Sequence, residues 1–167
     1  MPNIVSDRPV SGAPTAASWG QEVHDYIESG GILARQEFTG PVSITGTTEA
    51  AATTVVTAPA VVLAAAGILE IEFVCGALFP PNAANGSLIL VVFENGVAVG
   101  RINAIQAATA SAGWIYPGGV MKARRSVAAG TYTYSVRAHV SSGTGTVYAG
   151  PGGAAAYFPG SLMVSAV

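Results

Sequence analysis

The chain has 167 residues, of which 50% are hydrophobic, 8% are aromatic and only 10% are charged, whereas about 25% of residues are charged in typical soluble domains. No run of about 18 apolar residues occurs, so we expect no transmembrane helix and no membrane partner, and the first residues lack the pattern of a signal peptide. The single cysteine, Cys75, excludes an intrachain disulfide and a cysteine-based zinc site.

The net charge of −2 hides an uneven distribution along the chain. All nine acidic residues lie within residues 1–100, and the charged residues within 101–167 are all basic. This basic part lacks a nucleic-acid-binding motif, so we expect no nucleic-acid partner. The acidic and basic segments are expected to meet within one subunit or between subunits. A chain so poor in charge exposes much apolar surface, which favours a stable oligomer.

The N-terminal residues 1–33 are predicted to form an attachment segment. Residues 2–14 contain several prolines and no periodic pattern, which predicts an extended arm. Residues 15–31 predict the one convincing helix of the chain, with Ser18 or Thr15 as its N-terminal cap and Gly30 at its end. Its apolar stripe has the spacing i, i+4, i+7, i+8. The residues predicted to bind a partner are Pro9, Pro14, Trp19, Val23, Tyr26 and Ile27.

Residues 34–167 are predicted to form one antiparallel β-sandwich or barrel of about eight to ten strands. An Asn-Gly pair at residues 95–96 predicts a tight hairpin, and Pro59 is expected to interrupt a strand. Cys75 shares the apolar face of its strand and is predicted to be a small core residue. The predicted strands cover residues 38–44, 53–63 in two pieces, 68–75, 88–93, 97–102, 120–127, 131–140, 143–150 and 158–167.

The clearest strand is the one over residues 131–140. Tyr132, Tyr134 and the small apolar residues after them alternate without interruption with polar residues. A period of two indicates a half-buried strand with one face on the core. The opposite face, which includes Ser135, Arg137 and His139, is predicted to be simply a polar face.

Two stretches resemble known families. Residues Ala129–Tyr134 and Phe158–Leu162 resemble the closing strands of C1q/TNF-like jelly-roll domains, although Tyr134 stands where Phe is usual. Residues Arg8–Asp25 resemble the arm-and-helix openings of small structural proteins of tailed phages that infect actinobacteria. The resemblances imply a homotrimeric jelly roll mounted on a virion through its N-terminal segment. The major capsid protein or another virion protein would be its partner.

No set of residues with the pattern of a catalytic, metal or cofactor site is present, so we expect no enzyme. Glu70 and Glu72 lie two residues apart on one strand face, about 6.6 Å between Cα atoms at about 3.3 Å per residue. An inverting glycosidase could use such a separation, but a solvated or intersubunit face is the simpler interpretation. The aromatic residues in or beside predicted loops, which could stack on a sugar ring, are Trp114, Tyr116, Tyr148 and Tyr157. Packing in the core or at an interface is the simpler interpretation of each of them.

Three classes of function follow. The first is a capsid decoration or head fibre protein on the virion surface, which binds the assembled shell through residues 1–33. The second is a tail-associated adhesin that binds a host receptor. A cell-wall glycosidase based on Glu70 and Glu72 is a distant third. The predicted tip loops at 80–86, 107–113 and 150–156 are short and nearly uncharged, which favours decoration over an adhesin.

Overall fold

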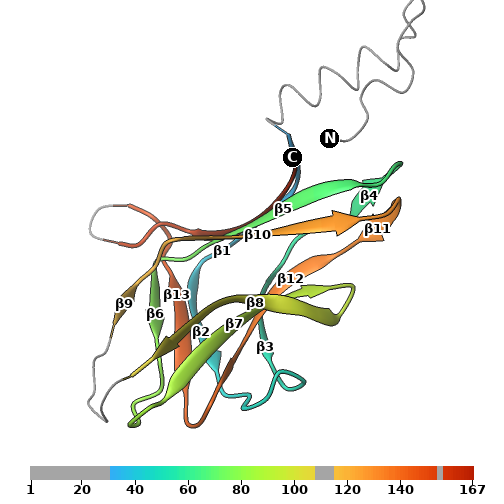
Figure 1. Cartoon of the computed structure of the whole chain (residues 1–167). Coiled ribbons are helices and arrows are strands. Elements are labelled where there is room, and N and C mark those ends of the chain that lie inside the picture. The colour runs from blue at the N-terminus through green and yellow to red at the C-terminus, as the bar shows by residue number, and fades with distance from the viewer. Residues whose placement is uncertain (1–30, 108–114, 154–155) are drawn as a thin grey trace, which may run out of the picture.

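The computed structural model describes residues 31–107, 115–153 and 156–167. These residues form β-strands and connecting loops, and contain no helix (Figure 1). The predicted arm at 2–14 and the helix predicted over 15–31, apart from Gly31, lie outside the described residues. The prediction of a mainly β, antiparallel chain is confirmed.

Strand pairing begins at Ile32, two residues before the predicted start of the β domain at Ala34. The strands of the described residues, in chain order, are β1 (Ile32–Phe38), β2 (Gly40–Ile44), β3 (Thr53–Thr57), β4 (Val61–Leu63), β5 (Gly67–Val74), β6 (Ala77–Phe79), β7 (Ser87–Glu94), β8 (Val97–Gln106), β9 (Tyr116–Pro117), β10 (Val120–Val127), β11 (Gly130–Tyr132), β12 (Tyr134–Val140), β13 (Gly145–Ala149) and β14 (Gly160–Ala166).

By their hydrogen bonds the described strands form four sheets, three with four strands and one with two. We group them into the two layers of the sandwich, here called the first and second sheets. The first sheet has two halves, which share the same order of chain segments: β1-β14-β5-β10, here called the ion-pair half, and β2-β13-β6-β9, here called the aromatic half. The second sheet is β3-β12-β7-β8, and the pair β4-β11 extends it at one end. Neighbouring strands are antiparallel throughout, for example β5 with both β10 and β14.

The order in which the chain visits the two sheets is that of a jelly roll. The successive strands β1 and β2, β3 and β4, β5 and β6, β9 and β10, β11 and β12, and β13 and β14 each pass along one sheet, and each of these pairs is counted here as one segment. These segments alternate between the first and second sheets, except at the β7–β8 hairpin, where the chain turns back within the second sheet. Neighbouring strands within each sheet therefore come from distant parts of the chain, as two interlocked Greek keys require. The strands β8 and β10 are the edge strands of their sheets on the same side of the sandwich.

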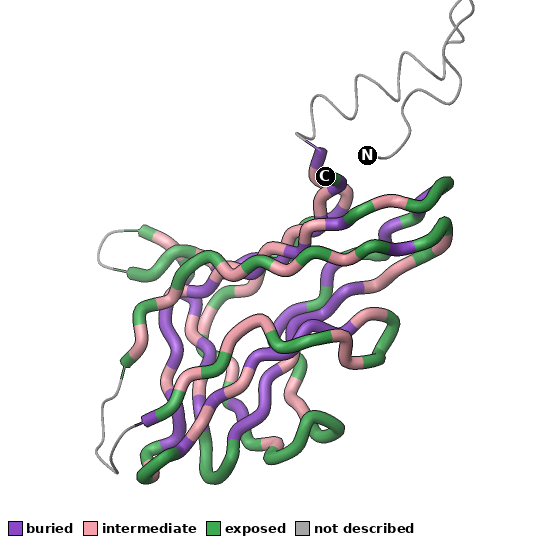
Figure 2. Tube along the Cα trace, in the orientation of Figure 1, coloured by how far each residue is buried: buried purple, intermediate pink, exposed green. Residues whose placement is uncertain are grey.

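The core lies between the two sheets, where Figure 2 shows the buried residues concentrated. On β5 the alternate residues Leu69, Ile71 and Phe73 are fully buried, and the residues between them face outward. Tyr134 on β12 has no exposed surface and is the largest fully buried side chain of the described residues. The period of two read from the sequence therefore assigned the inner faces of both strands correctly.

The predicted turns and breaks are confirmed at two places. Asn95 and Gly96 both have positive φ angles, 50° and 83°, as a type I′ hairpin turn requires at its two central residues. The strand predicted over residues 53–63 is divided around Pro59 into β3 and β4, because proline has no backbone N–H to donate to a neighbouring strand.

The strand predicted without interruption over residues 131–140 is divided at Thr133 into β11 and β12. Its polar face also differs from the prediction, because Ser135 and His139 are buried. The reason is position: β12 lies between β3 and β7, and short polar side chains on a central strand are shielded from both sides. The loop after β2 also approaches this strand, since the Val140 backbone N–H donates to the Gly46 carbonyl.

The last predicted strand, 158–167, begins later than expected, at Gly160. The preceding loop folds back on itself, because the backbone N–H groups of Gly150 and Gly152 donate to the carbonyls of Phe158 and Tyr157. Tyr157 and Phe158, whose carbonyls accept these bonds, are 45% and 80% exposed.

Candidate functional site

The outer face of the aromatic half carries a row of aromatic side chains. Val147 on β13 points into the core, so the alternation of the strand places Tyr148 on the outer face. The ring of Tyr148 lies 6.2 Å from that of Phe79 and 5.3 Å from that of Tyr157, edge to face in both cases. Together with the neighbouring Phe158, these residues define the aromatic surface.

Glycine makes room for this arrangement. A Cβ atom added to Gly76 would lie 2.9 Å from the Cβ of Tyr157, so the ring of Tyr157 packs where residue 76 has no side chain. Beyond Tyr157 the chain leaves Phe158 with 80% of its surface exposed. Tyr157, the preceding residue, is also exposed, and a contiguous exposed apolar patch is the kind of feature that marks a contact site.

The aromatic surface combines apolar rings with free polar groups. Tyr157 is 45% exposed, and neither its hydroxyl nor that of Tyr148 has a hydrogen-bond partner among residues 31–107, 115–153 and 156–167. Tyrosine has an apolar body and a polar tip, so such a surface can bury its rings against another protein or stack on a sugar ring.

Among the described residues, two of the aromatic residues predicted near loops, Tyr116 and Tyr157, lie in different surroundings. Trp114 lies outside the described residues. Tyr116 packs against the core, and its hydroxyl donates to the Gln106 carbonyl, whereas Tyr157 lies on the outer face with Tyr148. Tyr148, also predicted to lie beside a loop, does lie against Tyr157. The sequence analysis missed Phe79 and Phe158; only the pairing of β13 with β6 brings Phe79 onto one face with Tyr148.

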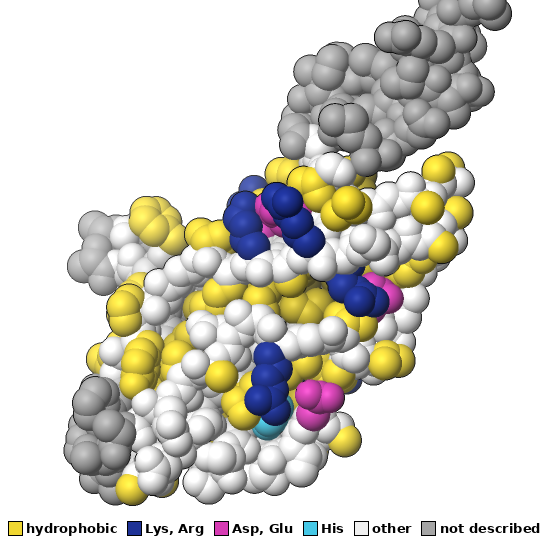
Figure 3. Space-filling view, in the orientation of Figure 1, with side chains coloured by type: hydrophobic (Ala, Val, Ile, Leu, Met, Phe, Trp, Pro, Cys, Tyr) yellow, Lys and Arg dark blue, Asp and Glu magenta, His cyan; other side chains and the backbone are white. Residues whose placement is uncertain are grey.

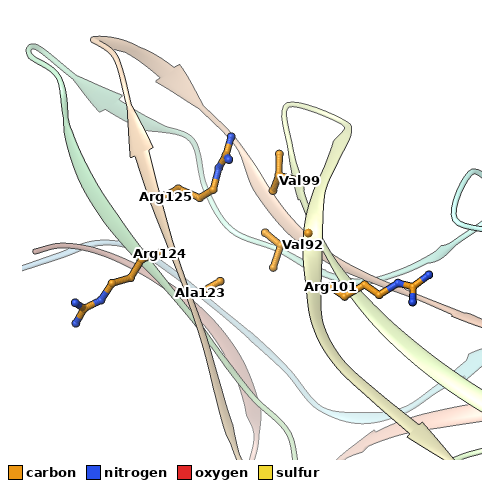
Figure 4. Close-up of a pocket in the computed structure, with 7 residues that line it drawn as sticks. Val92, Val99, Arg101, Ala123, Arg124 and Arg125 are labelled. Atoms are coloured by element: carbon orange, nitrogen blue, oxygen red, sulfur yellow. The ribbon is translucent and has the colours of Figure 1, made fainter.

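A second apolar feature lies at the open edge of the sandwich, between β8 and β10. Figure 3 shows hydrophobic atoms exposed in a hollow between the two sheets. Val92, Val99 and Ala123 point into this crevice, while Arg101 and Arg124 point away from it, and only Arg125 turns toward the gap (Figure 4). The crevice has a volume of about 160 Å³. Small-molecule sites usually span about 300–1,000 Å³, so it suits a side chain of a neighbouring molecule better.

An ionic network closes one end of the crevice. The Arg125 guanidinium donates to both carboxylate oxygens of Glu94, at 3.3 and 3.4 Å, and the Tyr134 hydroxyl donates to Glu94 Oε2 at 2.7 Å. Hydrogen bonds to Glu94 raise the pKa of Arg125, and burial together with the same carboxylate raises the pKa of Tyr134. Both partners therefore keep their protons, and the network is structural.

The carboxylates proposed for a glycosidase are neutralised by basic side chains. Lys122 Nζ lies 2.8 Å from Glu70 and 2.7 Å from Glu72, and Arg124 Nε lies 3.1 Å from Glu70. This group covers the outer face of β5 and β10 in Figure 3. The hydrogen bonds from Lys122 and Arg124 lower the pKa of Glu70, whereas a general acid needs a raised pKa. Glu70 and Glu72 are therefore members of an ion-pair network with Lys122 and Arg124.

Cys75 is buried, as predicted, and burial raises its pKa to about 11. We predict that a disulfide reagent such as DTNB at pH 8 reacts with the native protein at least about 100-fold more slowly than with the unfolded chain, because the thiolate is the reactive form. The absorbance of released thiolate in buffer and in guanidinium chloride measures the ratio. Equal rates would show that Cys75 is accessible.

The part of the chain that the structure describes contains no group of three or more His, Cys, Asp or Glu residues that could hold a metal ion. Within the same residues no helix is long and apolar enough to cross a membrane. The predicted partner-binding residues of the N-terminal segment, from Pro9 to Ile27, lie outside the described residues.

Comparison with known proteins gives no family. No family model matches the chain, and no curated protein matches it. Among solved structures, the chain is similar to a carbohydrate-binding module (CBM6cm-2) from Cellvibrio mixtus lichenase 5A in complex with cellotriose, with 14% identity over 80% of this chain and 97% of that chain and a TM-score of 0.32. It is also similar to Eiger TNF from S. frugiperda, with 9% identity over 81% of this chain and 92% of that chain and a TM-score of 0.37. Both TM-scores are low, so it is the strand pairing of this chain, and not these similarities, that identifies the jelly roll.

Proposed function

We propose that this chain is a virion structural protein of a tailed phage, a capsid decoration or head fibre protein on the particle surface. Its β domain would be a trimeric jelly roll of the C1q/TNF-like kind, and residues 1–33 would attach it to the major capsid protein or another virion protein. The observation that carries the proposal is the aromatic surface, which offers an exposed contact area for a neighbouring subunit.

The distribution of apolar surface supports association between copies of the chain. The aromatic surface lies on the outer face of the first sheet, and the crevice lies between β8 and β10. They are different surfaces, so contact between them would be heterologous, and a heterologous contact that closes forms a ring. Phe158 projects from the first surface, and the crevice has room for one bulky side chain of a neighbour.

Attachment through residues 1–33 is supported by the composition of that segment. Trp19, Val23 and Ile27 are the aromatic and aliphatic types that dominate binding energy at protein interfaces. The prolines of the arm restrict its free conformations, so ordering the arm on a partner costs less entropy than ordering a flexible chain. A protein that binds the assembled shell and not its free subunits stabilises the shell by mass action.

One observation favours the second candidate, a tail-associated adhesin. The hydroxyls of Tyr148 and Tyr157, which have no hydrogen-bond partner among the described residues, suit a sugar ligand as well as a protein. If this function is correct, the aromatic surface stays exposed to solvent in the assembled particle and no neighbouring subunit covers it.

The number of copies per particle separates the two candidates. We expect many copies, in a fixed ratio to the major capsid protein, because a decoration protein occupies repeated sites on the shell. Quantitative mass spectrometry of purified particles measures this ratio. The double variant Trp19→Ala, Val23→Ala is expected to lose at least about 90% of incorporation, since losing two anchor residues costs several kcal/mol of binding free energy.

The matched control is Val62→Ala, which changes an exposed valine on β4 and is expected to incorporate normally. A phage particle has one tail, so a tail protein is present in only a few copies per particle. Such a low copy number would overturn the decoration function in favour of the adhesin. Normal incorporation of the double variant would refute attachment through the helix stripe.

A further inference from the structure

A buried histidine on β12 has no hydrogen bond to either nitrogen of its ring. His139 is 7% exposed, and Nδ1 and Nε2 are both buried without a partner among the residues that the structure describes. Buried polar atoms without partners are uncommon in native proteins and require an explanation. An imidazolium has two donors and a full charge, and burying an unpaired charge costs far more than burying a neutral polar group. The position therefore suits the ring only while it is neutral.

The strands around His139 hold its backbone in place. The flanking residues Ala138 and Val140 belong to the core, so the alternation of the strand directs His139 to the outer face of the second sheet. β12 is hydrogen-bonded to β3 on one side and to β7 on the other. The backbone of β12 cannot move away from the ring without breaking the sheet, so relief of a charge on His139 has to come from outside the sheet.

Charged groups from two other elements act on the ring with opposite effects. Burial and the guanidinium of Arg101 on β8 lower the pKa of His139, and the carboxylate of Glu49, in the loop between β2 and β3, raises it to a smaller extent. On β12 itself, Arg137 is held 4.3 Å from the ring centre of Phe93. Figure 3 shows basic, acidic and histidine side chains gathered on this part of the molecule. The pKa of His139 lies below its ordinary value of 6.5 as a result.

The loop between β2 and β3, residues 45–52, is the part of these surroundings that can move without breaking a sheet. Its residues 48–52 form a tight turn through their own backbone hydrogen bonds. The loop is fastened to the end of β12 beside the histidine, because the backbone N–H of Val140 donates to the Gly46 carbonyl at 2.9 Å. A loop with internal hydrogen bonds can move as a unit, and local opening of such segments costs much less than global unfolding.

We propose that His139 is an acid-sensitive switch for this loop: the neutral ring keeps residues 45–52 closed over the end of β12, and its protonation opens them. Opening breaks the hydrogen bond between Val140 and Gly46 and lets water reach the charged ring. The inference is independent of the proposed virion function, because His139 and the loop belong neither to the N-terminal segment nor to the aromatic surface.

The direction of the pH effect follows from the lowered pKa. In the open form the ring meets water and titrates near its ordinary value of about 6.5, whereas in the closed form its pKa is lower. The open form therefore binds the proton more tightly. The closed form has its full stability above about pH 6.5 and loses it as the pH falls from there toward the lower pKa.

Amide hydrogen exchange followed by NMR tests the local opening. The protection factor of the Val140 amide, corrected for intrinsic exchange at each pH, is expected to fall at least about fivefold between pH 7.5 and pH 5.5. The amide of Ile71, on the central strand β5 of the first sheet, is the internal reference and is expected to stay protected. Unchanged protection at Val140 would overturn the switch. An equal loss at Val140 and Ile71 would also overturn it, because it would show global unfolding.

The variant His139→Phe tests whether the histidine is the titrating group. Phenylalanine keeps an aromatic ring at this position but cannot be protonated. We expect the protection factor of the Val140 amide in this variant to be the same at pH 7.5 and pH 5.5. An acid response that persists in His139→Phe would refute the proposal.

The variant Arg101→Gln tests the same switch with the histidine in place. It removes the positive charge that opposes protonation, so the pKa of His139 should rise and the fall in Val140 protection should become smaller. The ring is followed by NMR in a His24→Gln background, because His24 and His139 are the two histidines of the chain. The matched control Arg35→Gln, on the first sheet, should leave both readouts unchanged. A pKa of His139 that does not rise in Arg101→Gln, or that rises equally in Arg35→Gln, would contradict the switch.

Discussion

Replacing Tyr134 with alanine is expected to lower the free energy of unfolding by about 3–5 kcal/mol, the usual cost of truncating a large buried aromatic side chain. Tyr134 has no exposed surface, lies in the middle of the core and donates its hydroxyl to Glu94. Domains of this size are stable by only about 5–15 kcal/mol. The variant therefore loses at least about a fifth of its stability.

The variant Tyr134→Phe separates the two contributions of this residue. Phenylalanine keeps the ring in the core but removes the donor to Glu94, whose carboxylate retains the bonds from Arg125. We expect a loss of about 1–2 kcal/mol, the cost of one hydrogen bond to a charged group. Urea unfolding at a single protein concentration measures both variants, with Val62→Ala, an exposed residue, as the control. If Tyr134→Phe were as unstable as Tyr134→Ala, the hydroxyl and not the ring would dominate.

The sequence was sufficient to predict the parts of the fold that depend on neighbours along the chain. The alternation in β5 and β12 identified Ile71, Phe73 and Tyr134 as core residues, and Asn95-Gly96 identified its hairpin. These features depend on side-chain direction and local φ angles, which a few adjacent residues determine. The class of fold follows from such local signals when many short strands share one chain.

The candidate sites depend on pairing between distant segments, which no local pattern contains. Phe79 and Tyr148 meet only because β6 pairs with β13. His139 was predicted to lie on a solvated polar face, and it is buried because β12 is a central strand. A period of two assigns a residue to a face, but the burial of that face depends on its neighbours in the sheet.

The same limit applies to the charges. The segregation of acidic and basic residues along the chain predicted that the two kinds meet, and Lys122 and Arg124 of β10 do pair with Glu70 and Glu72 of β5. Antiparallel pairing of those strands places the residues directly opposite one another. Two carboxylates on one strand face could suggest catalysis only while their cross-strand partners were unknown.

Replacing Phe158 with aspartate is expected to convert the oligomer into folded monomers. With 80% of its surface exposed, Phe158 contributes little to the fold of its own chain. An aromatic residue at the centre of an interface is worth about 2–4 kcal/mol, and burying an unpaired carboxylate in its place adds a desolvation cost. At about 1.4 kcal/mol for each factor of ten, subunit affinity should fall by at least about 100-fold.

Sedimentation velocity at micromolar concentration measures the outcome. The parent protein is expected at three times its chain mass of 16.7 kDa, and Phe158→Asp at the mass of one chain. The matched control is Val62→Asp, which places the same charge on a valine that is 75% exposed on β4, away from the aromatic surface. A parent protein that sediments as a monomer would refute self-association. Dissociation of Val62→Asp but not of Phe158→Asp would move the interface to the β4–β11 end of the second sheet, because an exposed residue controls assembly only where subunits meet.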